Sequence, residues 1–143
     1  MKFIKITSLL ACVLLLTTAC HKKPKSGYKE IKIDQFVELQ MDQGVFIPAE
    51  DFKLTFTGVP EDSRCPKFTN CIQEGQVRVT MTAVYEGKSF PVEFTRKATE
   101  SSNNSATVAN YKVQLFDVQP FPESGKKINL ADYKARLVIR KIN

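Results

Sequence analysis

The chain of 143 residues contains no tryptophan and a single histidine, His21, which lies near the N-terminus. Ser-His-Asp triads, Cys-His dyads and most zinc sites need a histidine in the folded part, so this shortage argues against them. The sequence also lacks a glycine-rich phosphate loop, and its later part shows no convincing helical apolar period. We therefore expect an all-β fold with no metal, no cofactor and no catalytic residues, which means a protein that is not an enzyme.

Residues 1–19 have the layout of an export signal. Lys2 and Lys5 precede a charge-free apolar stretch that ends in small residues just before Cys20. This layout indicates a bacterial lipoprotein signal peptide, with Cys20 as the lipidated residue, acyl chains such as palmitate, and a membrane anchor. Cleavage before Cys12 fits the usual pattern better but leaves too short an apolar stretch. An ordinary signal peptide with an incidental cysteine is the other alternative.

Residues 20–29 would form the lipidated cysteine and a basic tether, because this segment holds four lysines and no acid. Its lysines could favour anionic head groups, or the segment could be a plain solvated linker. Residues 30–143 suffice for a single domain with one core. Six of the 21 basic residues precede Glu30, which leaves 15 in the domain, and all 15 acidic residues lie at Glu30 or after it. The domain therefore carries no net charge. This balance argues against a nucleic-acid partner.

Apolar and polar residues alternate with a period of two through most of this domain, which predicts strands with one buried face. Together these runs predict an antiparallel β-sandwich, compatible with an immunoglobulin-like outline, with a small β-barrel as the alternative. A hairpin turn is expected at residues 86–88, and Pro91 indicates an edge strand or a bulge. The main runs are 37–41, 52–57, 77–85, 90–94, 111–115 and 133–139, with shorter pieces at 45–47 and 126–130.

Two segments depart from this regular pattern. Residues 98–109 are rich in Ser, Asn and Thr and are expected to form a mobile connecting loop. Lys134, Arg136 and Arg140 share one face of the last run. Such charges often protect an edge strand from pairing with another chain, and we favour this interpretation over a polyanion site.

The segment EDSRCPKFTNC, residues 61–71, is the richest in chemistry. Because an exported domain permits disulfides, Cys65 and Cys71 are expected to pair and to close a short loop. A redox role or a metal site is less favoured, because the spacing is not CxxC and two thiols supply too few ligands. Asp62 is well placed to accept hydrogen bonds from following backbone N–H groups. Arg64 could pair with a neighbouring acid or with carbonyl groups, or present its guanidinium to a ligand.

The same segment resembles a group of small, uncharacterised bacterial lipoproteins of the Bacteroidetes type. They share a DSRCP motif, a short loop and then C-[IV]-W-x-G, matched here by residues 62–66, Cys71, Ile72 and Gly75. The resemblance extends more loosely to residues 118–120 and to the run that begins at Tyr133. It implies a fold and a compartment rather than a reaction. Gln73 stands where the group has tryptophan.

Three functions are compatible with these features. The favoured one is a non-catalytic binding or interaction module in the bacterial cell envelope, with an envelope protein, a peptide or a glycan as partner. Its candidate interaction loop includes Asp62, Ser63, Arg64 and Lys67. One alternative is a protease inhibitor that inserts Arg64 or Lys67 into a cleft. The other is an envelope hydrolase that uses the carboxylates near the loop, those of Asp62, Glu61 and Glu74. The absence of acidic residues after Cys20 favours the periplasm-facing side.

Overall fold

The computed structural model describes residues 27–97 and 104–142. The predicted signal peptide, Cys20 and the tether as far as Ser26 lie outside these residues. Among the described residues, no helix is both long enough and apolar enough to cross a membrane.

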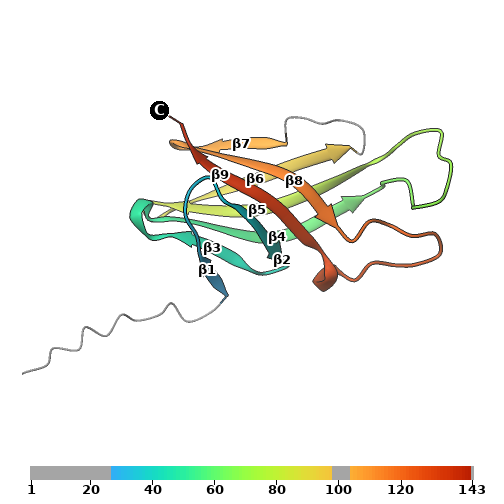
Figure 1. Ribbon diagram of the computed structural model, residues 1–143, viewed down its shortest axis with the longest axis horizontal. Helices are drawn as coiled ribbons and strands as arrows, with labels where there is room; N and C mark the ends of the chain where they lie inside the picture. Colours follow the sequence, from blue (N-terminus) through green and yellow to red (C-terminus); the bar gives the residue numbers. More distant parts are fainter. Residues whose placement is uncertain (1–26, 98–103, 143) are drawn as a thin grey trace, which may run out of the picture.

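The described part consists of strands and two short 3-10 helices, which confirms the all-β prediction. The strands form two sheets (Figure 1). Sheet A has the order β1-β3-β4-β5-β6, with β1 (Tyr28–Glu30), β3 (Gly44–Ile47), β4 (Phe52–Asp62), β5 (Gln76–Tyr85) and β6 (Lys88–Lys97). Sheet B has the order β2-β9-β8-β7, with β2 (Phe36–Gln40), β9 (Lys134–Lys141), β8 (Tyr111–Gln119) and β7 (Ser105–Val108). The 3-10 helices are η1 (Pro48–Glu50) and η2 (Leu130–Asp132).

One hydrophobic core lies between the two sheets, because alternate residues of both turn inward. Leu54 of sheet A and Val113 of sheet B are both fully buried in it. The core residues run from Ile31 to Ile139 and come from both sheets, so the described strands share one core. The buried positions follow the predicted alternation, such as Phe52, Leu54 and Phe56 along β4.

The sandwich prediction is confirmed, and the barrel alternative is wrong, because the two sheets remain separate in the described part. Sheet A is mixed rather than purely antiparallel, since β1 pairs in parallel with β3. The immunoglobulin-like outline holds for the architecture but not for the strand order. An immunoglobulin constant domain places strands A, B, E and D in one sheet, whereas here β3 to β6 follow one another within sheet A.

Local predictions had mixed outcomes. The two residues between β5 and β6, Glu86 and Gly87, both have positive φ, as a tight hairpin turn requires. Pro91 lies on β6, an edge strand of sheet A, as predicted. The expected loop 98–109 contains the strand β7, whereas residues 126–130 form no strand and lead instead into η2.

The N-terminal boundary of the domain also differs from the prediction. The domain begins two residues before Glu30, because Tyr28 and Lys29 belong to β1. The Tyr28 hydroxyl lies 2.9 Å from the Thr55 hydroxyl. A Cβ at Gly44 would lie 2.5 Å from the Tyr28 ring, so the tyrosine packs on a site that only glycine leaves open.

The basic last strand is not an edge strand, so that prediction is wrong. The strand β9 lies between β2 and β8, and its cations have cross-strand partners. Lys134 pairs with Glu38 at 3.4 Å and Arg140 with Asp34 at 3.4 Å. The Arg136 guanidinium stacks 4.6 Å from the centroid of an aromatic ring of β2. These contacts account for the charges as cross-strand pairs on a solvated sheet face.

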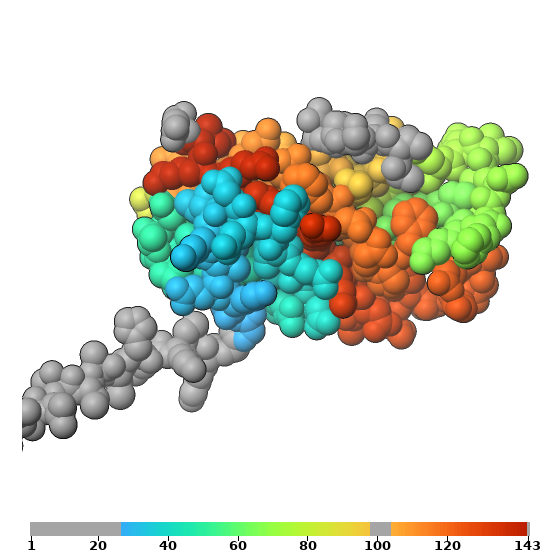
Figure 2. All heavy atoms as spheres, in the orientation of Figure 1, coloured from blue at the N-terminus to red at the C-terminus, as the bar shows by residue number. Residues whose placement is uncertain are grey.

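The long connections of the molecule gather at one end of the sandwich. Residues 63–75 join β4 to β5, and residues 120–133 join β8 to β9; Figure 1 shows both loops extending from the same end. The space-filling view shows the loop 63–75 as a projection next to the loop 120–133 (Figure 2). The described chain begins at Gly27, well away from this end (Figure 1).

Candidate functional site

The base of the loop 63–75, called the stapled loop below, continues the pairing of β4 with β5. The Ser63 N–H donates to the Gln76 carbonyl at 2.8 Å, and the Cys65 N–H donates to the Glu74 carbonyl at 2.9 Å. The Gln76 N–H donates to the Ser63 hydroxyl at 3.1 Å. Gly75 has a φ of +66°, and a Cβ there would lie 1.8 Å from the Ser63 carbonyl oxygen. The two ends of the loop, its first leg after β4 and its second leg before β5, can therefore approach this closely only with glycine at this position.

Arg64 points into the protein, which decides between the two interpretations of its side chain. It is 5% exposed, and its Nε and Nη2 donate to the two oxygens of Asp62 at 2.8 and 2.7 Å. Its Nη1 donates to the Val118 carbonyl at 2.6 Å, and Nη2 also donates to the Pro120 carbonyl at 3.0 Å. Its guanidinium lies 4.6 Å from the centroid of the Phe121 ring. Arg64 therefore ties the stapled loop to the end of β8 and is not available to a ligand.

The Asp62 carboxylate is equally occupied. Besides Arg64, it accepts from the Arg64 backbone N–H at 3.3 Å, as the sequence predicted, and from the Tyr133 hydroxyl at 3.0 Å. Burial, together with this hydrogen bond to a carboxylate, raises the pKa of Tyr133 to about 12. We call the group of Asp62, Arg64 and Tyr133 the arginine clamp. Asp62 and Arg64 lie two residues apart where β4 passes into the stapled loop, and Tyr133 directly precedes β9, so the clamp fixes the base of the loop to both sheets.

The predicted disulfide is present. Cys65 and Cys71 are bonded, with their Cα atoms 5.9 Å apart. Within the closed ring the Thr69 hydroxyl donates to the Pro66 carbonyl at 2.6 Å. The ring is also tied to the neighbouring loop, because the Lys67 N–H donates to the Pro122 carbonyl at 2.9 Å.

Two large apolar side chains of the stapled loop, one within the ring and one just after Cys71, touch almost nothing. Phe68 and Ile72 have relative exposures of 103% and 106%. Phe68 also has a positive φ of 62°, a conformation that costs free energy in a residue with a Cβ. The sequence interpretation overlooked these two residues as contact candidates and selected polar ones instead. The available signal was two apolar residues within a short polar loop, where alternation assigns them to no buried face.

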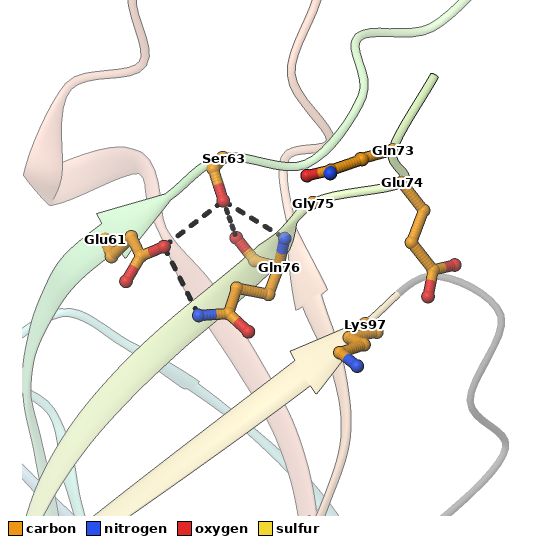
Figure 3. Close-up of a pocket in the computed structure, with 7 residues that line it drawn as sticks. All are labelled: Glu61, Ser63, Gln73, Glu74, Gly75, Gln76 and Lys97. Carbon is orange, nitrogen blue, oxygen red and sulfur yellow. Dashed lines mark hydrogen bonds between the residues drawn. The ribbon is translucent and has the colours of Figure 1, made fainter. Parts of the chain in front are cut away.

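A hollow of about 510 Å³ lies beside the base of the stapled loop, lined by Glu61, Ser63, Gln73, Glu74, Gly75, Gln76 and Lys97 (Figure 3). The Ser63 hydroxyl lies 3.2 Å from a Glu61 carboxylate oxygen and 3.1 Å from the Gln76 carbonyl, and can donate to either. Glu61 also pairs with Arg78 at 3.7 Å. Figure 3 shows Glu61 and Glu74 on opposite sides of this group, so the two acids do not converge on one point.

These positions bear on the two alternative functions. The inhibitor hypothesis placed Arg64 or Lys67 in a protease cleft; Arg64 is buried in the arginine clamp, so only Lys67 remains exposed for that role. The hydrolase hypothesis relied on Asp62, Glu61 and Glu74. Asp62 is held by Arg64 and Tyr133 and does not face the hollow that the other two line. Within residues 27–97 and 104–142, no three His, Cys, Asp or Glu side chains are grouped as metal ligands.

A second polar cluster lies at the opposite end of the sandwich, just before β4. Glu50 accepts a hydrogen bond from the Tyr111 hydroxyl and pairs with Lys141 at 2.9 Å. The hydrogen bond from Tyr111, followed by Lys141, lowers the pKa of Glu50. This cluster joins η1 to β8 and β9 and is explained by structure alone.

Comparison of the chain with protein-family models, with curated proteins and with solved structures finds no match.

Proposed function

We propose that this protein is a non-catalytic interaction module of the bacterial cell envelope, held at a membrane by a lipid on Cys20, and that the stapled loop is its contact surface. The observation that carries the proposal is the full exposure of Phe68 and Ile72 on a loop whose base is fixed. The resemblance of residues 62–75 to bacterial lipoproteins and the layout of the first twenty residues support the envelope location.

Exposed apolar side chains at the tip of a fixed loop suit binding for two reasons. Burying a large apolar side chain against a partner is worth about 1.5–3 kcal/mol. A loop that is already ordered loses little conformational entropy when it binds, so more of that free energy remains as affinity. Phe68 and Ile72 would then be the central contacts, surrounded by polar residues, which is the usual anatomy of a protein interface.

The surroundings of the tip favour a protein or peptide partner with an apolar pocket over a lipid surface or a glycan. Charges of both signs surround it: Glu123 pairs with Lys126 at 2.5 Å and with Lys67 at 3.9 Å. An anionic membrane would instead be matched by a uniformly basic rim. The described chain also begins well away from this loop, so an N-terminal anchor would attach at the part of the domain remote from the loop (Figure 1).

The contact surface can be tested in living cells with a photo-crosslinking residue in place of Asn70, which is exposed on the same ring. We expect a discrete cross-linked adduct that falls at least about tenfold when Phe68 and Ile72 are both changed to Ser. Ile142→Ser, another exposed apolar residue, is the matched control and should leave the adduct unchanged. The captured protein is then purified, and its affinity for the wild-type domain should exceed that for the double variant by about tenfold. The absence of an adduct, or an adduct indifferent to the double variant, would contradict the proposal.

The anchor is tested separately. Incorporation of a labelled palmitate analogue should require Cys20 and not Cys12, and Cys20→Ser should move the protein from the membrane fraction to the soluble fraction. Labelling that depends on Cys12, or no labelling at all, would refute the proposed anchor without bearing on the contact surface.

A further inference from the structure

The contacts that hold the base of the stapled loop do not involve the disulfide. The base of the stapled loop is held by the Cys65–Glu74 and Ser63–Gln76 backbone hydrogen bonds, and the arginine clamp holds Arg64 from below. None of these contacts passes through the sulfur atoms. Both sheets and the core of the described part are likewise complete without the ring of residues 65–71.

The shape of the tip, in contrast, depends on the disulfide. Phe68 and Ile72 make no packing contact that could hold the ring, because both are fully exposed. Inside the ring, the Thr69 hydroxyl and the Thr69 N–H both donate to the Pro66 carbonyl, at 2.6 and 3.3 Å. One backbone bond, from Lys67 to the loop 120–133, ties its first leg from outside. The second leg, from Asn70 to Gln73, is held to the first mainly through the Cys71 sulfur.

The sulfur atoms also lie where a reductant can reach them. Cys71 is exposed, and Cys65 is partly exposed. The Thr69 hydroxyl lies 3.4 Å from the Cys65 Sγ and 3.8 Å from the Cys71 Sγ, so a polar hydroxyl group rather than an apolar wall flanks the bond. Thiol–disulfide exchange requires this access of an attacking thiolate to a sulfur atom.

We propose that the Cys65–Cys71 disulfide is a redox switch for the contact surface, closed when oxidised and released by a dithiol reductant while the domain stays folded. This inference rests on the proposed function of the stapled loop. In the first step a thiolate of the dithiol attacks the Cys71 Sγ, the Cys65–Cys71 bond breaks, and the Cys65 thiolate leaves and takes up a proton. In the second step the other thiol of the reductant attacks the mixed disulfide and releases Cys71. The protein disulfide gains two electrons and two protons, and the dithiol becomes a disulfide.

The redox state would change the affinity for the partner by changing how well the ring is ordered before it binds. An oxidised ring presents Phe68 and Ile72 at a fixed spacing, whereas a reduced ring must be ordered again at each binding event, which weakens binding. The effect on the whole domain is smaller, because the ring is short. The chain-entropy account predicts a fall in Tm of about 10 °C or less on reduction.

The structural part of the proposal is tested on the chain from His21 to Asn143, which contains both sheets, with dithiothreitol as the dithiol. Hydrogen exchange read by mass spectrometry should rise about tenfold or more in residues 66–73 on reduction, while exchange in β4 and β5 and the circular dichroism stay unchanged. Trypsin should then cleave after Lys67 much faster than in the oxidised protein. The double variant Cys65→Ser, Cys71→Ser is the matched control: it should behave like the reduced protein and not respond to dithiothreitol. Unfolding of the domain on reduction, or unchanged exchange in the ring, would overturn the switch.

The functional part uses the cross-linker at Asn70. We expect the adduct to fall at least about tenfold in the double Cys→Ser variant while its circular dichroism matches wild type. An undiminished adduct would refute the switch and leave the proposed function intact. No adduct in the wild type would remove the proposed function and, with it, the switch.

Discussion

Replacement of Arg64 by methionine should be the most damaging single change in the loop region. Arg64 and Asp62 form a bidentate pair with side chains only 3% and 8% exposed. Methionine would leave the Asp62 carboxylate with two hydrogen-bond donors, the Arg64 backbone N–H and the Tyr133 hydroxyl. It would also remove the donors to the Val118 and Pro120 carbonyls. Breaking one partner of a buried ion pair typically costs about 3–5 kcal/mol, and we expect a loss in this range.

The measurement is urea unfolding followed by circular dichroism on the chain from His21. Asp62→Asn combined with Arg64→Met should lose at least about 1 kcal/mol less than the sum of the two single losses, because the pair is coupled. Arg140→Met is the control: its side chain is 47% exposed, and loss of its ion pair should cost no more than about 1 kcal/mol. A loss below about 1 kcal/mol for Arg64→Met would refute the inward-facing clamp and return Arg64 to the list of available ligand-binding groups.

Three further changes test the neighbouring structure. Gly75→Ala should cost at least about 2 kcal/mol in urea unfolding, because its φ is +66° and the new Cβ would lie 1.8 Å from the Ser63 carbonyl oxygen; an unchanged midpoint would contradict the close approach. Gly44→Ala should displace the Tyr28 ring and expose β1 to proteolysis after Lys29 with little effect on the core, and resistance equal to wild type would count against this packing. The raised pKa of Tyr133 contributes stability that is complete below pH 10 and is lost as the pH rises through about 12, so the stability difference between wild type and Tyr133→Phe should shrink over that interval; a difference that stays constant with pH would refute this linkage.

Much of the fold could be predicted because the residues that alternate as apolar in the sequence are the ones that the strands bury. Phe52, Leu54 and Phe56 alternate with polar residues and are all buried in β4. The disulfide was predicted because an exported domain was expected and only two cysteines remained in it, and the structure confirms the pair. The order of the strands in each sheet could not be predicted, because the apolar period of a strand does not show which strands pair with it. The basic strand β9 resembled an edge strand only because the acids that pair with it, Glu38 and Asp34, lie about one hundred residues earlier in the chain.

The candidate site was harder to predict, because its geometry depends on distant backbone atoms. The direction of Arg64 is decided by the carbonyl groups of Val118 and Pro120, which are 54 and 56 residues away in the chain. Asp62, two residues before Arg64, could have paired with it whether the arginine side chain turned inward or outward. Tyr133, which donates to Asp62, is 71 residues away from it in the chain, and only the folded loop between β8 and β9 brings the two together.

The stapled loop reverses the usual polarity of a surface loop. Its arginine is inside with four side-chain hydrogen bonds, and Phe68 and Ile72 are outside with no packing. Burial of Arg64 has a folding explanation, because its hydrogen bonds and Asp62 offset the desolvation of the guanidinium. Exposure of Phe68 and Ile72 has none: a polar side chain at either position would cost the fold nothing and would improve solubility. The residues of the DSRCP motif therefore build the base of the loop, whereas Phe68 and Ile72, which the fold does not require, are the residues on which the proposed contact surface depends.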